Sequence, residues 1–203
     1  MPRVLLLRHG HVHNPEGVLY GRLPEFRLSE EGRAMADAAA TFLRSSGEDV
    51  GRVVASPLLR AQQTAQPIAD EFGHELATDD RLIEAGNMYE GQPLPKPRDF
   101  LNPQRWWDLR NPWAPSWGEP YKDIARRMGG AIYAAAKANP DSTSVLVSHQ
   151  LPIWVARCAA QGRSFLHDPR QRQCALASLT AFDITDGRIR FEGYGETAVE
   201  APR

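Results

Sequence analysis

Cysteine is scarce in this chain of 203 residues, which contains only Cys158 and Cys174. The two are not spaced like metal ligands, and so few cysteines exclude a disulfide-stapled secreted scaffold. We therefore expect a cytoplasmic location, where thiols stay reduced.

Long apolar runs and an excess of one charge are also missing. No run approaches the roughly 20 residues that cross a bilayer, and residues 4–7 are too short for a signal-peptide core. The 24 basic and 25 acidic side chains give a formal net charge of -1, so no basic field favours nucleic acid. We expect neither a membrane nor a nucleic-acid partner. The chain shows no internal repeat and is 42% hydrophobic, which suits a single domain over residues 1–203.

An apolar run at residues 4–7 ends abruptly in Arg8, His9 and Gly10. Such a run, bounded by a turn residue, predicts a buried strand. Open α/β folds place their sites at the carboxyl ends of strands, where Arg8 and His9 would lie. Arginine offers a planar donor fork that fits phosphate, and histidine offers a nitrogen nucleophile. Alone, the tripeptide is equally typical of a strand end with a solvated Arg-His pair.

The Arg-His-Gly stretch after a first strand resembles the hallmark of the histidine phosphatase superfamily, also called the phosphoglycerate-mutase-like family. Residues 28–33, Leu-Ser-Glu-Glu-Gly-Arg, are similar to the family's next segment at the expected separation. Ser29 suits the N-cap of a helix, and apolar residues at helical spacing predict a buried stripe that includes Met35 and Phe42.

Residues 56–65 are similar to a third family segment, Ser-x-x-x-Arg-Ala-x-x-Thr-Ala. Ser56 as the cap and Pro57 at the first helical position predict a helix start. Arg60 would then lie in the first turn, where free N–H groups favour an anion. Pro67 predicts a kink or an early end of this helix.

Two further segments extend the resemblance. Residues 81–91 look like the family's Leu-x-Glu segment, which implies that Glu84 is the general acid. A predicted strand at 144–147 ends in Ser-His-Gln, where the family has Ser-His-Gly or a close variant. His149 therefore follows a second buried strand, and Gln150 replaces the usual glycine.

The remaining elements are predicted from periodicity and turn signals. Apolar residues at helical spacing predict a helix beginning near Tyr121 and another over 152–160. Strands at 178–184 and 188–191 flank Asp186-Gly187, a strong hairpin signal. The last residues are expected to form a frayed tail.

The resemblance implies an α/β fold, a three-layer α/β/α sandwich with a mostly parallel central sheet. It implies a phosphatase that acts on a small phosphomonoester through a phosphohistidine, without a metal or another cofactor. His149 would be cationic beside the phosphate. The implied catalytic residues are His9, Glu84, His149, Arg8 and Arg60, and the implied substrate-binding residues are Arg8, Asn14, Arg60 and His149.

Several alternatives stay open. Mutases and non-catalytic phospho-ligand-binding proteins belong to the same family, although the longer substrate loop of the cofactor-dependent mutases has no clear match here. His9, His11 and His13 alternate, as the ligands of a metallohydrolase could. Residues 17–22 have a short likeness to α-ribazole phosphate phosphatases, which gives one substrate candidate. The oligomeric state is also open, with a homodimer among the alternatives.

Residues 92–120 differ in composition from the rest, with clustered prolines and four of the five tryptophans. Long loops within compact domains are often lids, and a fixed aromatic flap is the alternative. As a lid, the segment would lie over the site, and Arg98, Arg105 and Arg110 would be available to a second anionic group of the substrate.

Overall fold

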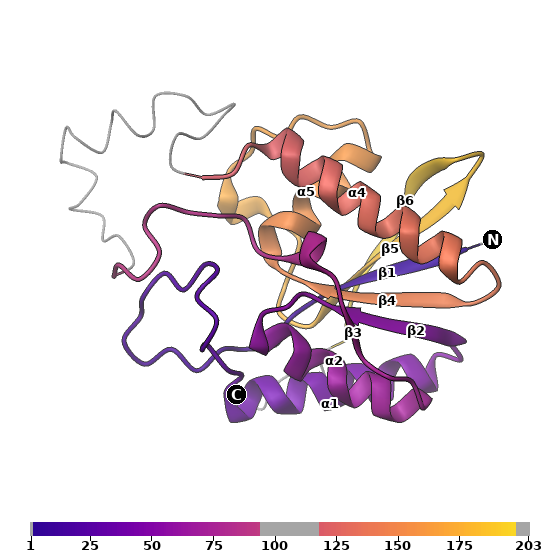
Figure 1. Cartoon of the computed structure of the whole chain (residues 1–203), viewed down its shortest axis with the longest axis horizontal. Helices are drawn as coiled ribbons and strands as arrows, with labels where there is room; N and C mark the ends of the chain where they lie inside the picture. The colour runs from indigo at the N-terminus through magenta and orange to yellow at the C-terminus, as the bar shows by residue number, and fades with distance from the viewer. Residues whose placement is uncertain (1, 94–117, 198–203) are drawn as a thin grey trace.

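The computed structural model describes residues 2–93 and 118–197, and a central sheet organises them (Figure 1). Within these residues, six strands pair in the order β3-β2-β4-β1-β5-β6. The strands are β1 (Arg3–Arg8), β2 (Val50–Ala55), β3 (Ala77–Thr78), β4 (Thr143–Ser148), β5 (Ser178–Thr185) and β6 (Arg188–Glu196). The pairings from β3 to β1 are parallel, while β5 runs antiparallel to β1 and β6 antiparallel to β5. The prediction of a mostly parallel sheet is confirmed.

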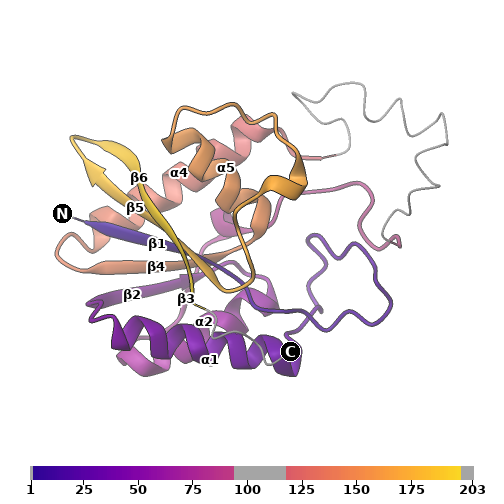
Figure 2. The same ribbon diagram turned by 180° about the vertical axis from the view of Figure 1, so that it is seen from behind.

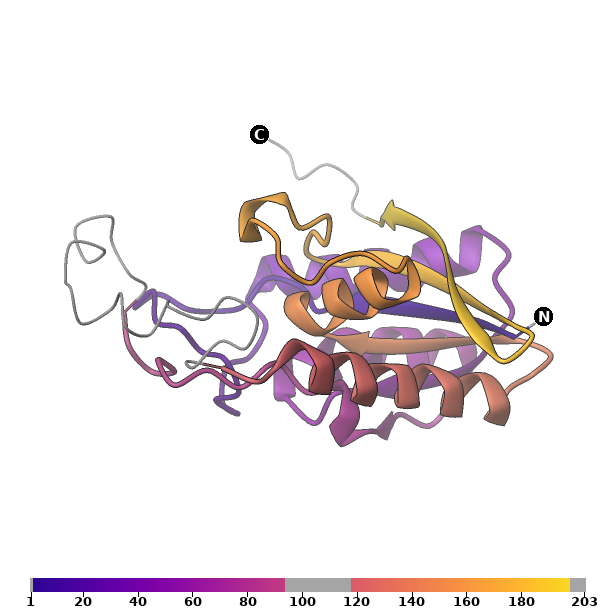
Figure 3. The same cartoon turned by 90° about the horizontal axis from the view of Figure 1, so that it is seen from above.

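Helices cover both faces of the sheet. One face carries α1 (Glu30–Ser45) and α2 (Leu59–Phe72), and the other carries α4 (Tyr121–Ala138) and α5 (Gln150–Ala160) (Figures 1 and 2). Seen from above, α4 and α5 lie toward the viewer, with the sheet and then α1 and α2 behind them (Figure 3). The predicted three-layer α/β/α sandwich is therefore confirmed. No helix in the described ranges combines the length and the apolar character needed to span a bilayer.

Strand residues alternate between two apolar layers. Leu5 and Leu7 belong to the cluster with α1 and α2, whereas Val4 and Leu6 belong to the cluster with α4 and α5. None of the four is more than 3% exposed. Burial on both faces explains why β1 is a continuous apolar run in the sequence.

Helix α1 begins as predicted, but the face that it buries differs. The Ser29 side chain caps the helix by accepting a hydrogen bond from the Gly32 N–H. Phe42 is 41% exposed, while Ala36 and Ala40 are buried. The helix contains many alanines, so a face of small residues can approach the sheet closely while Phe42 stays at the surface.

The predicted start of α2 is wrong, and of the kink or early end predicted at Pro67, the early end is wrong. The helix begins at Leu59 rather than Pro57, with Leu58 as its N-cap. The Ser56 hydroxyl accepts from the Leu58 N–H at 3.4 Å and also lies 2.8 Å from His149 Nε2. The helix also continues through Pro67 to Phe72. Its next turn is packed in the core, with Ile68 fully buried, which holds the chain helical despite the proline.

The C-terminal hairpin is confirmed. Asp186 and Gly187 both have positive φ, 52° and 69°, as a type I′ turn requires. Strand β6 runs on to Glu196, beyond the predicted end, because its pairing with β5 continues past a register shift at Ala181/Phe182 to Ser178 and Glu196. Helix α5 begins at Gln150, two residues before the predicted start.

The predictions for residues 94–117 lie outside the described residues. They comprise most of the expected lid or flap over 92–120 and the three arginines within it. The predicted tail at 198–203 lies outside them as well.

Candidate active site

The carboxyl ends of β1 and β4 bring two histidines together. Because the strands are parallel neighbours, Arg8 pairs with Ser148, and the next residues are His9 and His149. The His9 N–H donates to the Ser148 carbonyl at 3.1 Å. The two imidazole centroids lie 5.1 Å apart. In Figure 1 this edge of the sheet is on the side opposite the label N.

His9 is held in the form that a nucleophile needs. The residue is 2% exposed, and its Nδ1 lies 2.8 Å from the Gly10 carbonyl oxygen. A carbonyl only accepts, so Nδ1 carries the hydrogen and the lone pair is on Nε2. Burial, followed by the charge of Arg60, lowers the pKa of His9 to about 3. His9 is therefore neutral at pH 7, with Nε2 available.

Arg60 and Arg8 bring two positive charges to this edge. Arg60 is fully buried, donates from Nη2 to the Gly21 carbonyl at 2.5 Å and lies 4.8 Å from the centroid of Tyr20. Arg8 donates from Nη1 to the Cys174 carbonyl at 2.6 Å. Among the described residues, neither has an ion pair with a carboxylate, and the Nε of each is buried without a partner. Such uncompensated charge suits an anionic ligand.

His149 is fully buried, and its Nε2 lies 2.8 Å from the Ser56 hydroxyl. Its Nδ1 is buried and has no hydrogen-bond partner within the described ranges. Burial, together with His9, holds the pKa of His149 well below its usual range. The protein alone therefore keeps His149 neutral, and the expected cationic form depends on the negative charge of a bound phosphate.

Glu84 follows the short helix η1 (Asp80–Leu82) near the same edge. Burial raises the pKa of Glu84, which favours the protonated form. The Ala85 N–H donates to Glu84 Oε1 at 2.8 Å, and the charges of Arg60 and Arg8 also oppose the shift. Burial favours the protonated carboxyl group, whereas the hydrogen bond and the arginines favour the carboxylate. A carboxyl group under these opposing effects is suited to donate a proton.

A three-residue clamp holds the loop that carries Glu84. Glu119 pairs with Arg22 at 2.8 Å and with Arg127 at 2.9 Å. Arg22 also donates to the Glu84 carbonyl at 2.7 Å, and Arg127 donates to the Ile83 carbonyl at 2.6 Å. The clamp, defined as Arg22, Glu119 and Arg127, was not predicted, because its members come from three segments and form no sequence pattern.

Gly10 and Gly32 let helix α1 approach the loop after His9. A Cβ on Gly10 would lie 2.5 Å from the Gly32 carbonyl oxygen, and one on Gly32 would lie 2.0 Å from the His11 oxygen. The Gly10 N–H donates to the Thr64 hydroxyl at 3.1 Å, which ties the loop to α2 as well. Backbone packing therefore explains both glycines.

Within the described residues, the hydrogen bonds of three further residues considered in the sequence, Asn14, His11 and His13, do not involve His9, His149, Arg8 or Arg60. The Asn14 amide bonds both the N–H and the carbonyl of Val18, at 3.2 and 2.9 Å, within its own loop. His11 and His13 are both exposed. The Nδ1 atom of His11 lies 2.8 Å from the Ser29 hydroxyl oxygen. Residues 2–93 and 118–197 contain no group of three His, Cys, Asp or Glu side chains arranged to hold a metal.

Tyr20 was not predicted as part of the site. Its ring lies 6.5 Å from His9 and stacks on Phe26 at 5.3 Å. Its loop lies beside the segment after Glu84, where the Leu19 N–H donates to the Gln92 carbonyl at 2.8 Å. The sequence feature that pointed to this loop was the short likeness of residues 17–22 to α-ribazole phosphate phosphatases. That likeness gave a substrate candidate but assigned no role to the Tyr20 ring.

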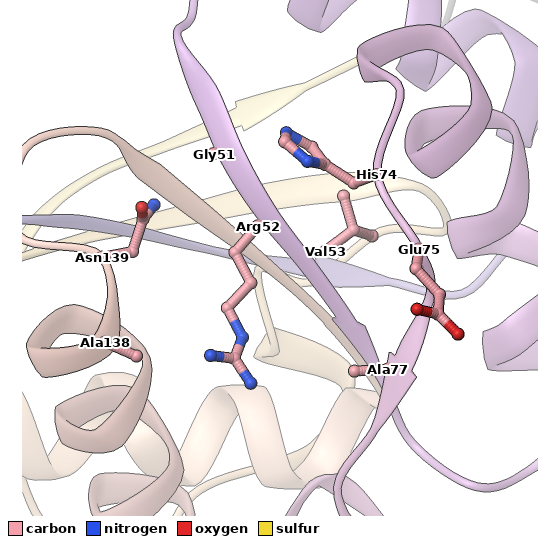
Figure 4. A pocket seen from close by; sticks show the side chains of 8 residues that line it. All are labelled: Gly51, Arg52, Val53, His74, Glu75, Ala77, Ala138 and Asn139. Carbon is pink, nitrogen blue, oxygen red and sulfur yellow. The ribbon is translucent and has the colours of Figure 1, made fainter.

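A separate hollow of about 320 Å³ lies at the amino-terminal edge of β2 and β3 (Figure 4). Its polar lining includes Arg52, His74, Glu75 and Asn139. His74 Nε2 bonds the Val50 carbonyl at 2.7 Å, so this histidine supports the sheet edge. Because His9 follows the opposite end of its strand, the hollow is distinct from the candidate active site.

Known proteins resemble this chain throughout its length. The sequence model of the histidine phosphatase superfamily (branch 1) matches residues 4–197. An uncharacterized protein of Mycobacterium tuberculosis is 50% identical, covering 97% of this chain and 96% of its own. A 2,3-bisphosphoglycerate-dependent phosphoglycerate mutase of Thermoplasma acidophilum is 30% identical, with coverages of 93% and 90%. The structure of a mycobacterial glucosyl-3-phosphoglycerate phosphatase superposes with a TM-score of 0.76 at 26% identity, covering 95% of this chain and 96% of that one. On the family match and the relatives together, this chain belongs to the histidine phosphatase superfamily.

Proposed function

We propose that this protein is a phosphatase that hydrolyses a small phosphomonoester through a phosphohistidine on His9. The observation that carries the proposal is the pairing of a buried, neutral His9 with two arginines that have no carboxylate partner within the described residues. A neutral imidazole is nucleophilic, and the arginines balance the charge of a phosphoryl group.

The proposed reaction has two chemical steps. His9 Nε2 attacks phosphorus, the ester P–O bond breaks, and the Glu84 carboxyl group gives its proton to the departing alkoxide. A water molecule then attacks phosphorus, its proton passes to the Glu84 carboxylate, and the P–N bond breaks to release phosphate. Arg8, Arg60 and His149 are the groups that would stabilise the equatorial oxygens.

Hydrolysis is favoured over mutation on two grounds. The chain has no clear counterpart of the longer substrate loop of the cofactor-dependent mutases. A structural relative that covers 95% of the chain is named as a phosphatase. A relative named as a mutase supports the alternative. Release of inorganic phosphate, measured beside interconversion of 2- and 3-phosphoglycerate, separates the two.

The decisive experiment seeks phosphate on a histidine. Rapid quenching with a phosphomonoester should leave acid-labile phosphate on His9, and His9→Ala should remain folded while losing several orders of magnitude in turnover. Chelators should not change the rate, because the arginines supply the positive charge. Phosphate found on His149 would overturn the assignment, and binding without turnover would favour a non-catalytic phospho-ligand protein.

A further inference from the structure

Arg172 is a third arginine near the candidate active site. It follows the short helix η3 (Pro169–Gln171) and is half-buried. Its Nε donates to His167 Nε2 at 2.8 Å, and its Nη1 lies 3.5 Å from Gln150 Oε1. Both partners are uncharged acceptors. Within the described residues, no carboxylate lies within ion-pair distance of Arg172.

His167 is built to hold this arginine without neutralising it. Its Nδ1 lies 2.6 Å from the Phe165 carbonyl, so Nδ1 carries the hydrogen and Nε2 is left to accept from Arg172. Burial lowers the pKa of His167, which favours this neutral form. The ring also packs between Tyr121 and Trp154, at centroid distances of 6.3 and 5.4 Å. The support is therefore uncharged and is packed against two aromatic rings.

The position of Arg172 is beside the phosphate-binding arginines rather than among them. Arg8 donates to the Cys174 carbonyl, and the Cys174 N–H donates to the Arg172 carbonyl at 3.0 Å. Burial raises the pKa of Glu84, and the nearby charge of Arg172 opposes this shift. Its bonding partner Gln150 directly follows His149. Arg8 and Arg60, by contrast, are anchored to backbone carbonyls of Cys174 and Gly21. Arg172 thus has its own anchors next to the site.

We propose that Arg172 binds a second anionic group of the substrate, most simply a carboxylate, while Arg8 and Arg60 bind the phosphate. This inference rests on the proposed phosphatase function. Withdrawing an arginine partly from water without a carboxylate partner costs free energy, which an anionic ligand group would recover. The planar guanidinium also fits a carboxylate in bidentate geometry. The substrate class is therefore a phosphomonoester that carries a carboxylate close to the ester.

A matched pair of substrates tests this inference. 3-Phosphoglycerate and glycerol 3-phosphate differ in a carboxylate in place of a hydroxymethyl group. Arg172→Ala should raise KM for 3-phosphoglycerate by about 10- to 100-fold, as expected for loss of a charged hydrogen bond, and change KM for glycerol 3-phosphate less than about twofold. Arg170→Ala is the matched control, because Arg170 is nearby, 91% exposed and paired with Asp168.

A positioning role through Glu84 makes a different prediction. Arg172→Ala would then lower kcat on both substrates alike and move the pH profile of kcat, and this result would overturn the inference. Equal KM values for the two substrates in the wild type would overturn it as well.

Binding measurements separate this inference from the proposed function. In the His9→Ala background, calorimetry should show tighter binding of 3-phosphoglycerate than of glycerol 3-phosphate, and adding Arg172→Ala should abolish the difference. If the wild type releases no phosphate but the binding difference is present, the phosphatase proposal fails and the anion site stands. If phosphate is released but the difference is absent, the anion site fails alone.

Discussion

The two histidines of the candidate site differ in their hydrogen-bond partners, and this difference fits the different roles proposed for them. His9 has its Nδ1 on a carbonyl, which fixes one tautomer, whereas His149 Nε2 meets a hydroxyl that can donate or accept. His149 can therefore gain a proton when phosphate charge arrives without breaking its bond to Ser56. For His9 the bond to the Gly10 carbonyl would also survive protonation at Nε2, so it is burial, followed by the charge of Arg60, that keeps this residue neutral, as a nucleophile requires.

Glu84 gives the first prediction at the scale of single residues. A general acid matters most when the leaving alcohol is a poor one, and burial raises the pKa of Glu84. Glu84→Gln should lower kcat for an alkyl phosphate by roughly 100-fold or more, and lower it much less for p-nitrophenyl phosphate. Release of phosphate measures both. Glu75→Gln, in the remote hollow of Figure 4, is the control. An equal loss on the two substrates would contradict an acid role.

The clamp on the Glu84 loop belongs to the scale of elements. Glu119 joins Arg22 and Arg127, and these arginines hold the carbonyls of Glu84 and Ile83. Glu119→Gln should lower kcat about 10-fold, with KM nearly unchanged, because the donor carboxyl group loses its position. The loss should be larger for alkyl than for aryl phosphates.

A double-mutant cycle checks this positioning role of Glu119. If the clamp acts through Glu84, adding Glu119→Gln to Glu84→Gln should cost little further activity. Fully additive losses would indicate a separate role. Asp123→Asn is the matched control, since Asp123 pairs with Arg126, which is 81% exposed.

The same scale shows what the sequence could and could not predict. Strands β1 and β4 are continuous apolar runs that end in polar residues, so their ends and the approach of His9 to His149 could be anticipated. Strand β3 has only two residues, too few to form a pattern. The contact between Ser56 and His149 could not be predicted either, because His149 is far along the chain. Arg172 and the clamp were missed for the same reason, since their partners come together only in the fold.

At the scale of the whole molecule, burying the site affects stability. The folded chain keeps His9 and His149 neutral, with the pKa of His9 at about 3 and that of His149 well below its usual range. Below pH 6.5 the unfolded chain binds protons at both residues and the folded chain does not. The two histidines therefore do not reduce the free energy of unfolding above about pH 6.5. Below that pH, each of them lowers it by up to about 1.4 kcal/mol per pH unit. Glu84, with a raised pKa, acts in the opposite direction above its ordinary value of 4.5.

Comparing variants isolates the contribution of one histidine from these opposing effects. Urea unfolding at pH 7.5 and 5.5 should show a smaller decrease in unfolding free energy for His149→Asn than for the wild type, whatever the absolute stability of the variant. If wild type and His149→Asn lose the same free energy between the two pH values, His149 is not held neutral in the folded protein. A cation at that position before phosphate binds would then change the order of the mechanism, because the site would offer its full positive charge to the incoming substrate.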